Sequence, residues 1–194
     1  MKKMTLALAV ALFVFCLPFP LFSQSLDWQI QFLRGRNRES TPINRAIRME
    51  NGDAFMLVIK ADADCYCYVI CYDSEQQIDT FFNEAIKGGS EISVGPIGLI
   101  EPSGTETMYA IVSVSRLADL ERLIDQNENS PSRQNTSDLY REIVRLQNAA
   151  SDLGEPATAI ITSGGTSRGA ADEQSFATRF TGKEMYVRSI SIRH

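Results

Sequence analysis

The chain has 194 residues, of which 19 are basic and 24 acidic, and its formal net charge at pH 7 is −5. A protein with this acidic balance is not built to coat nucleic acid, whose phosphates are bound by clusters of lysine and arginine. Hydrophobic residues make up 44% of the chain. After the first 24 residues about 170 remain, a length that suits one domain with a single core.

The first 24 residues have the order of a cleavable secretory signal. Two lysines precede an apolar run over residues 6–17, and two prolines then lead to the small residue Ser23. The run is shorter than the roughly 20 residues that a membrane-spanning helix needs, so an uncleaved anchor is the weaker alternative. Lipid attachment at Cys16 is another alternative, which the bulky Phe15 disfavours. We therefore expect export to the periplasm or beyond, with membrane contact only through the transient signal.

Apolar runs with turn signals between them indicate β-strands in the first half of the remaining chain. Residues 28–32 alternate apolar and polar side chains, the period of a half-buried strand. Residues 55–59, 65–72 and 78–82 follow, and we expect them to form an antiparallel meander whose central strand is buried on both faces. Further strands are predicted at residues 91–94, 107–114, 157–162, 175–180 and 185–192.

Helical spacing is found at two places. Residues 116–125 carry their leucines on one stripe, with Ser115 as the expected N-cap. A second helix is predicted from Asp138 onward, and the polar stretch 126–136 between the two is expected to be a flexible surface loop.

These elements together predict a mainly β fold. We expect a β-sandwich-like, antiparallel domain over residues 25–194, with a helical hairpin inserted at about residues 115–154.

The sequence contains no pattern typical of a catalytic site. Its only histidine, His194, is the last residue, where we expect fraying, and this argues against a histidine-dependent triad or a histidine-ligated metal site. The glycine-rich loop 163–169 lacks the lysine of a phosphate-binding P-loop. We therefore expect no enzyme, no cofactor and no metal. Paired carboxylates, as in a hydrolase of envelope polymers, remain an alternative because their pairing is spatial.

Three cysteines, Cys65, Cys67 and Cys71, lie within seven positions. A spacing of two and four along a strand places them on one face, where near neighbours have poor geometry for a disulfide. We expect free, buried thiols that act as small apolar residues. The alternatives are an intermolecular disulfide, which export would permit, and a zinc site, for which a fourth ligand is missing.

A cluster of arginines within fifteen residues stands out on this acidic chain. It suggests a patch for an anionic partner, such as an acidic or phosphate-bearing envelope polymer, whereas the alternative is a solvated loop. The candidate partner-binding residues are Arg34, Arg36, Arg38, Arg45 and Arg48.

Several short motifs occur in a recognisable order. Asn51-Gly52-Asp53 enters a strand, the tyrosine-rich strand Cys65-Tyr66-Cys67-Tyr68-Val69-Ile70 follows, and then come Phe81-Phe82-Asn83 and Pro102-Ser103-Gly104-Thr105-Glu106. In this order, residues 28–115 resemble the exported bacterial family called domain of unknown function 4384. The resemblance implies a β-rich accessory domain with no established reaction, found alone or joined to signalling or protease-like domains. The cysteine-bearing strand and the helical insertion depart from the family pattern.

We therefore expect an exported, non-catalytic binding module of the bacterial cell envelope, which engages a protein or an envelope polymer through an exposed loop face. A structural role, with self-association into a homo-oligomer through a sheet edge or a disulfide, is the remaining alternative.

Overall fold

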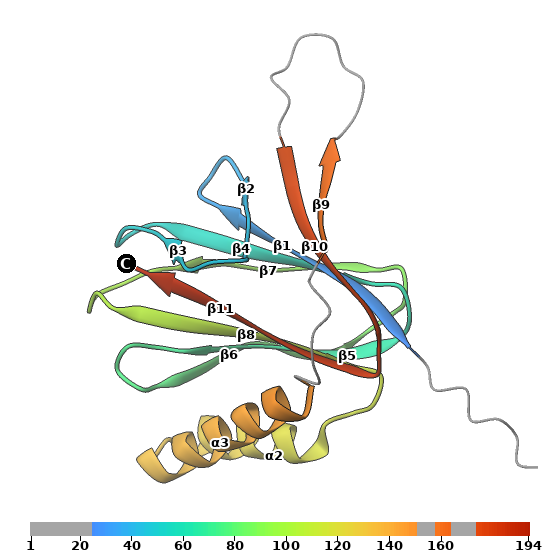
Figure 1. Cartoon of the computed structure of the whole chain (residues 1–194). Helices are drawn as coiled ribbons and strands as arrows, with labels where there is room; N and C mark the ends of the chain where they lie inside the picture. Colours follow the sequence, from blue (N-terminus) through green and yellow to red (C-terminus); the bar gives the residue numbers. More distant parts are fainter. Residues whose placement is uncertain (1–24, 151–157, 164–173) are drawn as a thin grey trace, which may run out of the picture.

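The computed structural model describes residues 25–150, 158–163 and 174–194. The expected secretory signal and most of the glycine-rich loop lie outside the described residues. Within them the fold is mainly β with a pair of helices, as predicted (Figure 1). In chain order the elements are β1 (Leu26–Arg34), β2 (Glu39–Thr41), β3 (Ile47–Arg48), β4 (Ala54–Ala61), β5 (Cys65–Tyr72), β6 (Ile78–Ile86), β7 (Glu91–Gly98), β8 (Thr105–Ser113), α2 (Ala118–Asn129), α3 (Arg133–Ala150), β9 (Thr158–Ser163), β10 (Gln174–Lys183) and β11 (Met185–Arg193).

The strands form two sheets that face each other (Figure 1). The first sheet has the order β7-β4-β1-β10-β9, with β2 paired to β1, and the second has the order β3-β11-β8-β5-β6. Every pairing among these strands is antiparallel except that of β3 with β11, which is parallel. The helices cover the outer face of the second sheet, so the molecule has three layers in the order sheet, sheet and helices.

The expected meander is wrong in one connection. The hairpin of β5 and β6 is present, but β4 pairs with β1 and β7 in the first sheet whereas β5 pairs with β6 and β8 in the second. The chain therefore crosses between sheets at residues 62–64. A short polar break between two apolar runs is compatible both with a hairpin turn and with a connection to the other sheet. The local sequence therefore does not distinguish these two connections.

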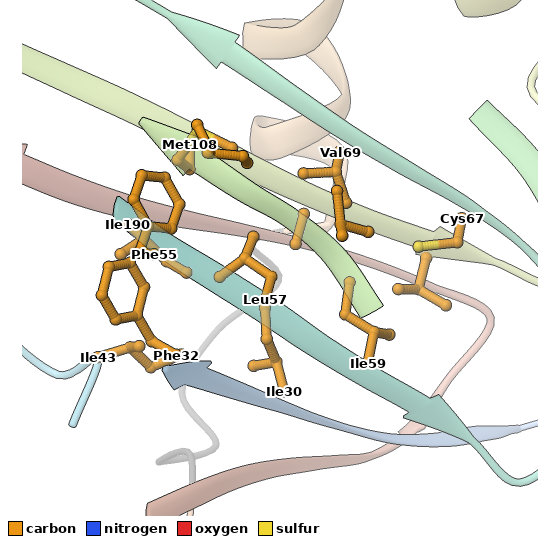
Figure 2. Close-up of a cluster of buried hydrophobic side chains, with 14 of the residues drawn as sticks. Ile30, Phe32, Ile43, Phe55, Leu57, Ile59, Cys67, Val69, Met108 and Ile190 are labelled. Carbon is orange, nitrogen blue, oxygen red and sulfur yellow. The ribbon is translucent and has the colours of Figure 1, made fainter. Parts of the chain in front are cut away.

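The main core lies between the inner faces of the two sheets (Figure 2). Leu57 and Ile59 of β4 meet Cys67 and Val69 of β5, and all four are 0% exposed. Fully burying aliphatic side chains of this size stabilises a fold by roughly 1.5–3 kcal/mol each. These contacts join the sheets into one sandwich.

A second core lies between the second sheet and the helices. The outer side chains Tyr68 and Ile70 of β5 pack with Leu120 of α2 and with Leu139 and Ile143 of α3. Strand β5 is thus buried on both faces, as its two-sided apolar pattern predicted.

The helices differ from the prediction at their ends. The expected loop 126–136 is wrong, because only residues 130–132 separate α2 from α3. Its polar residues form internal hydrogen bonds instead: the Thr136 hydroxyl donates to Asn127 Oδ1 at 3.0 Å, and Asn127 Nδ2 donates to the Ile78 carbonyl at 3.3 Å. Among the described residues, no helix is long and apolar enough to cross a membrane.

The expected cap at Ser115 is also wrong. Helix α2 has no side-chain cap of its own. The backbone N–H of Leu117 donates instead to the hydroxyl of Tyr68, at 3.0 Å, so the sheet itself supplies the acceptor at the start of this helix.

Candidate functional site

A pocket of about 620 Å³ lies beside the short strand β3. Its wall combines the end of β1, the connection from β2 to β3, and the end of β11. Four of its lining residues are arginines: Arg34, Arg45, Arg48 and Arg193. We refer to it as the arginine pocket.

Strand pairing brings two of these arginines together. Arg48 of β3 and Arg193 of β11 are direct partners in the parallel pair, and the preceding residues Ile47 and Ile192 are buried in the main core. Because side chains alternate along a strand, both arginines project away from that core and are exposed. Like charges directly opposite each other are destabilising, and a bound anion would relieve their repulsion.

Arg34 has a carboxylate partner, Asp53. Its Nη2 donates to Asp53 Oδ2 at 2.8 Å, and its Nη1 donates to the carbonyl of Arg48 at 3.3 Å. The pKa of Asp53 is lowered, first by the hydrogen bond from the backbone N–H of Glu50 and then by Arg34. Asp53 is therefore ionised at neutral pH and neutralises this guanidinium.

The other three arginines of the pocket have no carboxylate partner in the part of the chain that the structure describes. Arg45, Arg48 and Arg193 form no ion pair with any described residue. The pocket thus gathers three free guanidinium groups on a chain whose net charge is negative. Such groups bind carboxylates and phosphates through paired hydrogen bonds.

The structure divides the five arginines of the predicted patch. Arg34, Arg45 and Arg48 line the pocket. Arg36 and Arg38 lie in the exposed turn between β1 and β2 and do not line it. Arg193 was missed, since it is far from the others in sequence and only the pairing of β3 with β11 brings it near.

His194 is not frayed, and this expectation is wrong. Its backbone exchanges two hydrogen bonds with Gly104, at 3.0 and 3.1 Å, which extend the pairing of β11 with β8. The imidazole is 0% exposed, with Nδ1 against Asn51 Oδ1 and Nε2 at 3.2 Å from Glu106 Oε1. The thiol of Cys71 lies 3.8 Å from the other oxygen of Glu106.

This row of Cys71, Glu106 and His194 closes one end of the sandwich. The Cys71 residue is 4% exposed, the His194 side chain 0% and the Glu106 side chain 14%, so the row is largely buried. Among the described residues no group of three or more His, Cys, Asp and Glu side chains could hold a metal ion. The row brings together side chains from the end of β5, the start of β8 and the residue after β11.

The three thiols of β5 are free and buried, as predicted. Cys65, Cys67 and Cys71 are 3%, 0% and 4% exposed, and all three belong to the main core. Burial raises the pKa of Cys65 to about 11 and raises the pKa of the other two thiols as well. A disulfide to another molecule would require the sandwich to open.

No described pocket is lined by two carboxylates, the arrangement that the hydrolase alternative requires. A pocket of about 610 Å³ beside α3 contains Glu75 as its one acidic residue, and one of about 220 Å³ beside β1 contains Asp62. The arginine pocket contains none. Beside the smallest of these pockets, Arg179 Nη2 bridges Asp62, at 3.4 Å, and Asp27, at 3.0 Å, so the two carboxylates that lie near each other there share one guanidinium.

No family model, no curated protein and no solved structure matches the chain. The class that the fold and the pocket define is a β-sandwich with a helical layer and a cationic pocket at one edge.

Proposed function

We propose that the protein is an exported, non-catalytic binding module of the bacterial cell envelope that holds an anionic envelope polymer in the arginine pocket. One observation carries this proposal: Arg45, Arg48 and Arg193 line a single pocket and have no carboxylate partner among the described residues.

The size of the pocket favours a chain over a single ion. A volume of about 620 Å³ lies within the roughly 300–1,000 Å³ of small-molecule sites, far more than one phosphate group occupies. Three guanidinium groups can contact successive anionic units of a polymer. Each charge-assisted contact adds to affinity, and the whole interaction should weaken as salt is raised.

Two parts of the proposal, export and a role without catalysis, rest on the sequence. The order of residues 1–24 favours secretion. The resemblance to an exported accessory family without an established reaction agrees with a binding role.

A self-associating role has one observation in its favour. Strand β6 is an edge of the second sheet, and Phe81 on it is 41% exposed. The β-bulge at Phe81, where the register with β5 shifts, works against this role because it twists the edge away from a flat partner.

The proposal is tested by calorimetric titration with two defined polyanions, long-chain polyphosphate and polygalacturonate. Arg48→Ser combined with Arg193→Ser should weaken binding about tenfold or more, since two charge-assisted contacts are lost. The matched control is Arg36→Ser with Arg38→Ser, which removes the same charge from the exposed turn and should change affinity less than about threefold. Equal weakening in both variants, or no polyanion binding by the wild-type protein, would contradict the proposal.

A further inference from the structure

A second hollow, of about 610 Å³, lies between the turn that joins β5 to β6 and the first turns of α3. We refer to it as the helix groove. Its walls include Tyr72, Gln76 and Gln77 from the sheet side and Arg133 and Tyr140 from the helix side. It shares no lining residue with the arginine pocket.

The groove is rigidly built on both sides. The rings of Tyr72 and Tyr140 stack with their centroids 4.4 Å apart and an interplanar angle of 25°, which joins the end of β5 to α3. The carboxylate of Asp73 accepts the backbone N–H groups of Glu75 and Gln77, at 2.9 and 2.7 Å, and so fixes the turn. The turn and the ring pair are therefore in place before any ligand arrives, which lowers the entropic cost of binding.

Several polar side chains in the groove are uncommitted. Glu75, Gln76, Gln77 and Arg133 are exposed, and their side chains form no hydrogen bond with any described residue. The hydroxyl of Ser132, by contrast, accepts the N–H of Asn135 at 3.1 Å and caps α3. Because this backbone N–H at the start of α3 already has an acceptor, the helix N-terminus is not part of the argument for a ligand.

We propose that the helix groove binds a neutral oligosaccharide. Its charged groups, Glu75 and Arg133, cancel, so it has no preference for net charge. Glutamine amides donate and accept hydrogen bonds at once, as the hydroxyls of a sugar also do. The partly exposed tyrosines, whose rings stack on each other, add apolar surface beside these amides.

This site is independent of the proposed function, because the arginine pocket selects for negative charge whereas the helix groove is neutral. A neutral glycan carries no charge with which the three guanidinium groups could pair, so it gains nothing from the feature that defines the arginine pocket.

The test is affinity electrophoresis of the purified protein in native gels that contain dextran, mannan or a β-glucan. Gln77→Ala with Arg133→Ala should weaken retardation by at least one of these polymers about tenfold or more. The control, Arg122→Ala with Gln126→Ala, removes the same two residue types from the exposed face of α2, where they bond to each other, and should leave retardation unchanged. Both variants alter exposed side chains, and thermal unfolding verifies that they are folded.

Three outcomes would overturn the inference. These are no retardation by any of the neutral polymers, equal retardation of the groove variant and the wild type, and loss of retardation in the Arg48→Ser/Arg193→Ser variant instead. The last would assign glycan binding to the arginine pocket, whose preference for anions the polyanion titration tests separately.

Discussion

Tyr68, which is 0% exposed, links the second sheet to the helices through its hydroxyl. The substitution Tyr68→Phe therefore measures how much the hydrogen bonds of this hydroxyl contribute to the free energy of unfolding. The hydroxyl donates to Glu121 Oε1 at 2.9 Å and accepts the N–H of Leu117 at 3.0 Å. The substitution keeps the ring and removes one oxygen. It leaves the N–H of Leu117, which precedes α2, and one carboxylate oxygen of Glu121 without their partner.

The expected loss of unfolding free energy is about 2 kcal/mol. An unsatisfied buried donor costs about 1–3 kcal/mol, and a hydrogen bond to a charged group contributes about 1.5–3 kcal/mol. Glu121 keeps its bond from Arg116, at 2.6 Å, which limits the loss. For a domain of this size, about 2 kcal/mol corresponds to a decrease in Tm of roughly 4–8 °C.

Urea unfolding of the wild type, Tyr68→Phe and Tyr66→Phe measures this directly. Tyr66 lies on the same face of β5, is only half-buried, and its hydroxyl has no hydrogen-bond partner among the described residues, so its variant should change stability by less than about 0.5 kcal/mol. The pKa of Glu121 is lowered, mainly by the hydrogen bond from Arg116, so its contribution is present at neutral pH and lost as the pH falls through that lowered pKa. The difference in unfolding free energy between the wild type and Tyr68→Phe should therefore become smaller in acid. Equal stabilities of the two variants at neutral pH would refute the link.

Three further predictions concern the core, the thiols and the arginine pocket. Leu57→Ala removes a side chain that is 0% exposed between the sheets and should cost about 2–5 kcal/mol in urea unfolding, whereas a loss below 1 kcal/mol would mean that the sandwich is loosely packed. The three cysteines of β5 should resist a thiol reagent such as Ellman's reagent in the native protein and react in guanidinium, and rapid native reaction would contradict their burial. Asp53→Asn frees Arg34 from its carboxylate and should tighten polyphosphate binding severalfold in calorimetry, an increase that a purely structural role of Arg34 would not produce. Since the pKa of Asp53 is lowered, the same variant should also lose less stability than the wild type as the pH falls through that pKa.

Local pattern was enough to predict the longer strands and the two helices, but not the short strands β2 and β3 or the pairing of the strands. The alternation at residues 28–32 and the two-sided apolar run of β5 predicted strands with the observed burial. The crossing after β4 was not predictable, because a hairpin and a corner between sheets use the same short polar break. The loop expected at 126–136 failed for a related reason: Asn127 and Thr136 are polar in sequence, yet their hydrogen bonds to each other and to the sheet allow them to be buried.

The candidate site was predictable in part. Arg34, Arg45 and Arg48 could be found because they are close in sequence. Arg193 could not, since the parallel pairing of a two-residue strand with β11 leaves no sequence signal. The helix groove was not predicted. One of its sides is a turn, and the other is the start of α3, which lies in the stretch 126–136 that the sequence predicted to be a loop.

The central claim, that an anionic partner occupies the arginine pocket, is tested most directly by photo-crosslinking in intact cells of the source organism. A photoreactive amino acid replaces Ala46, which is exposed in the pocket wall, or Asn37, which is exposed in the turn between β1 and β2. We predict an adduct with an anionic polymer from position 46 that decreases strongly when Arg48→Ser and Arg193→Ser are added, and little adduct from position 37. Adducts of equal yield from both positions, or an adduct at position 46 that does not depend on the arginines, would contradict the claim.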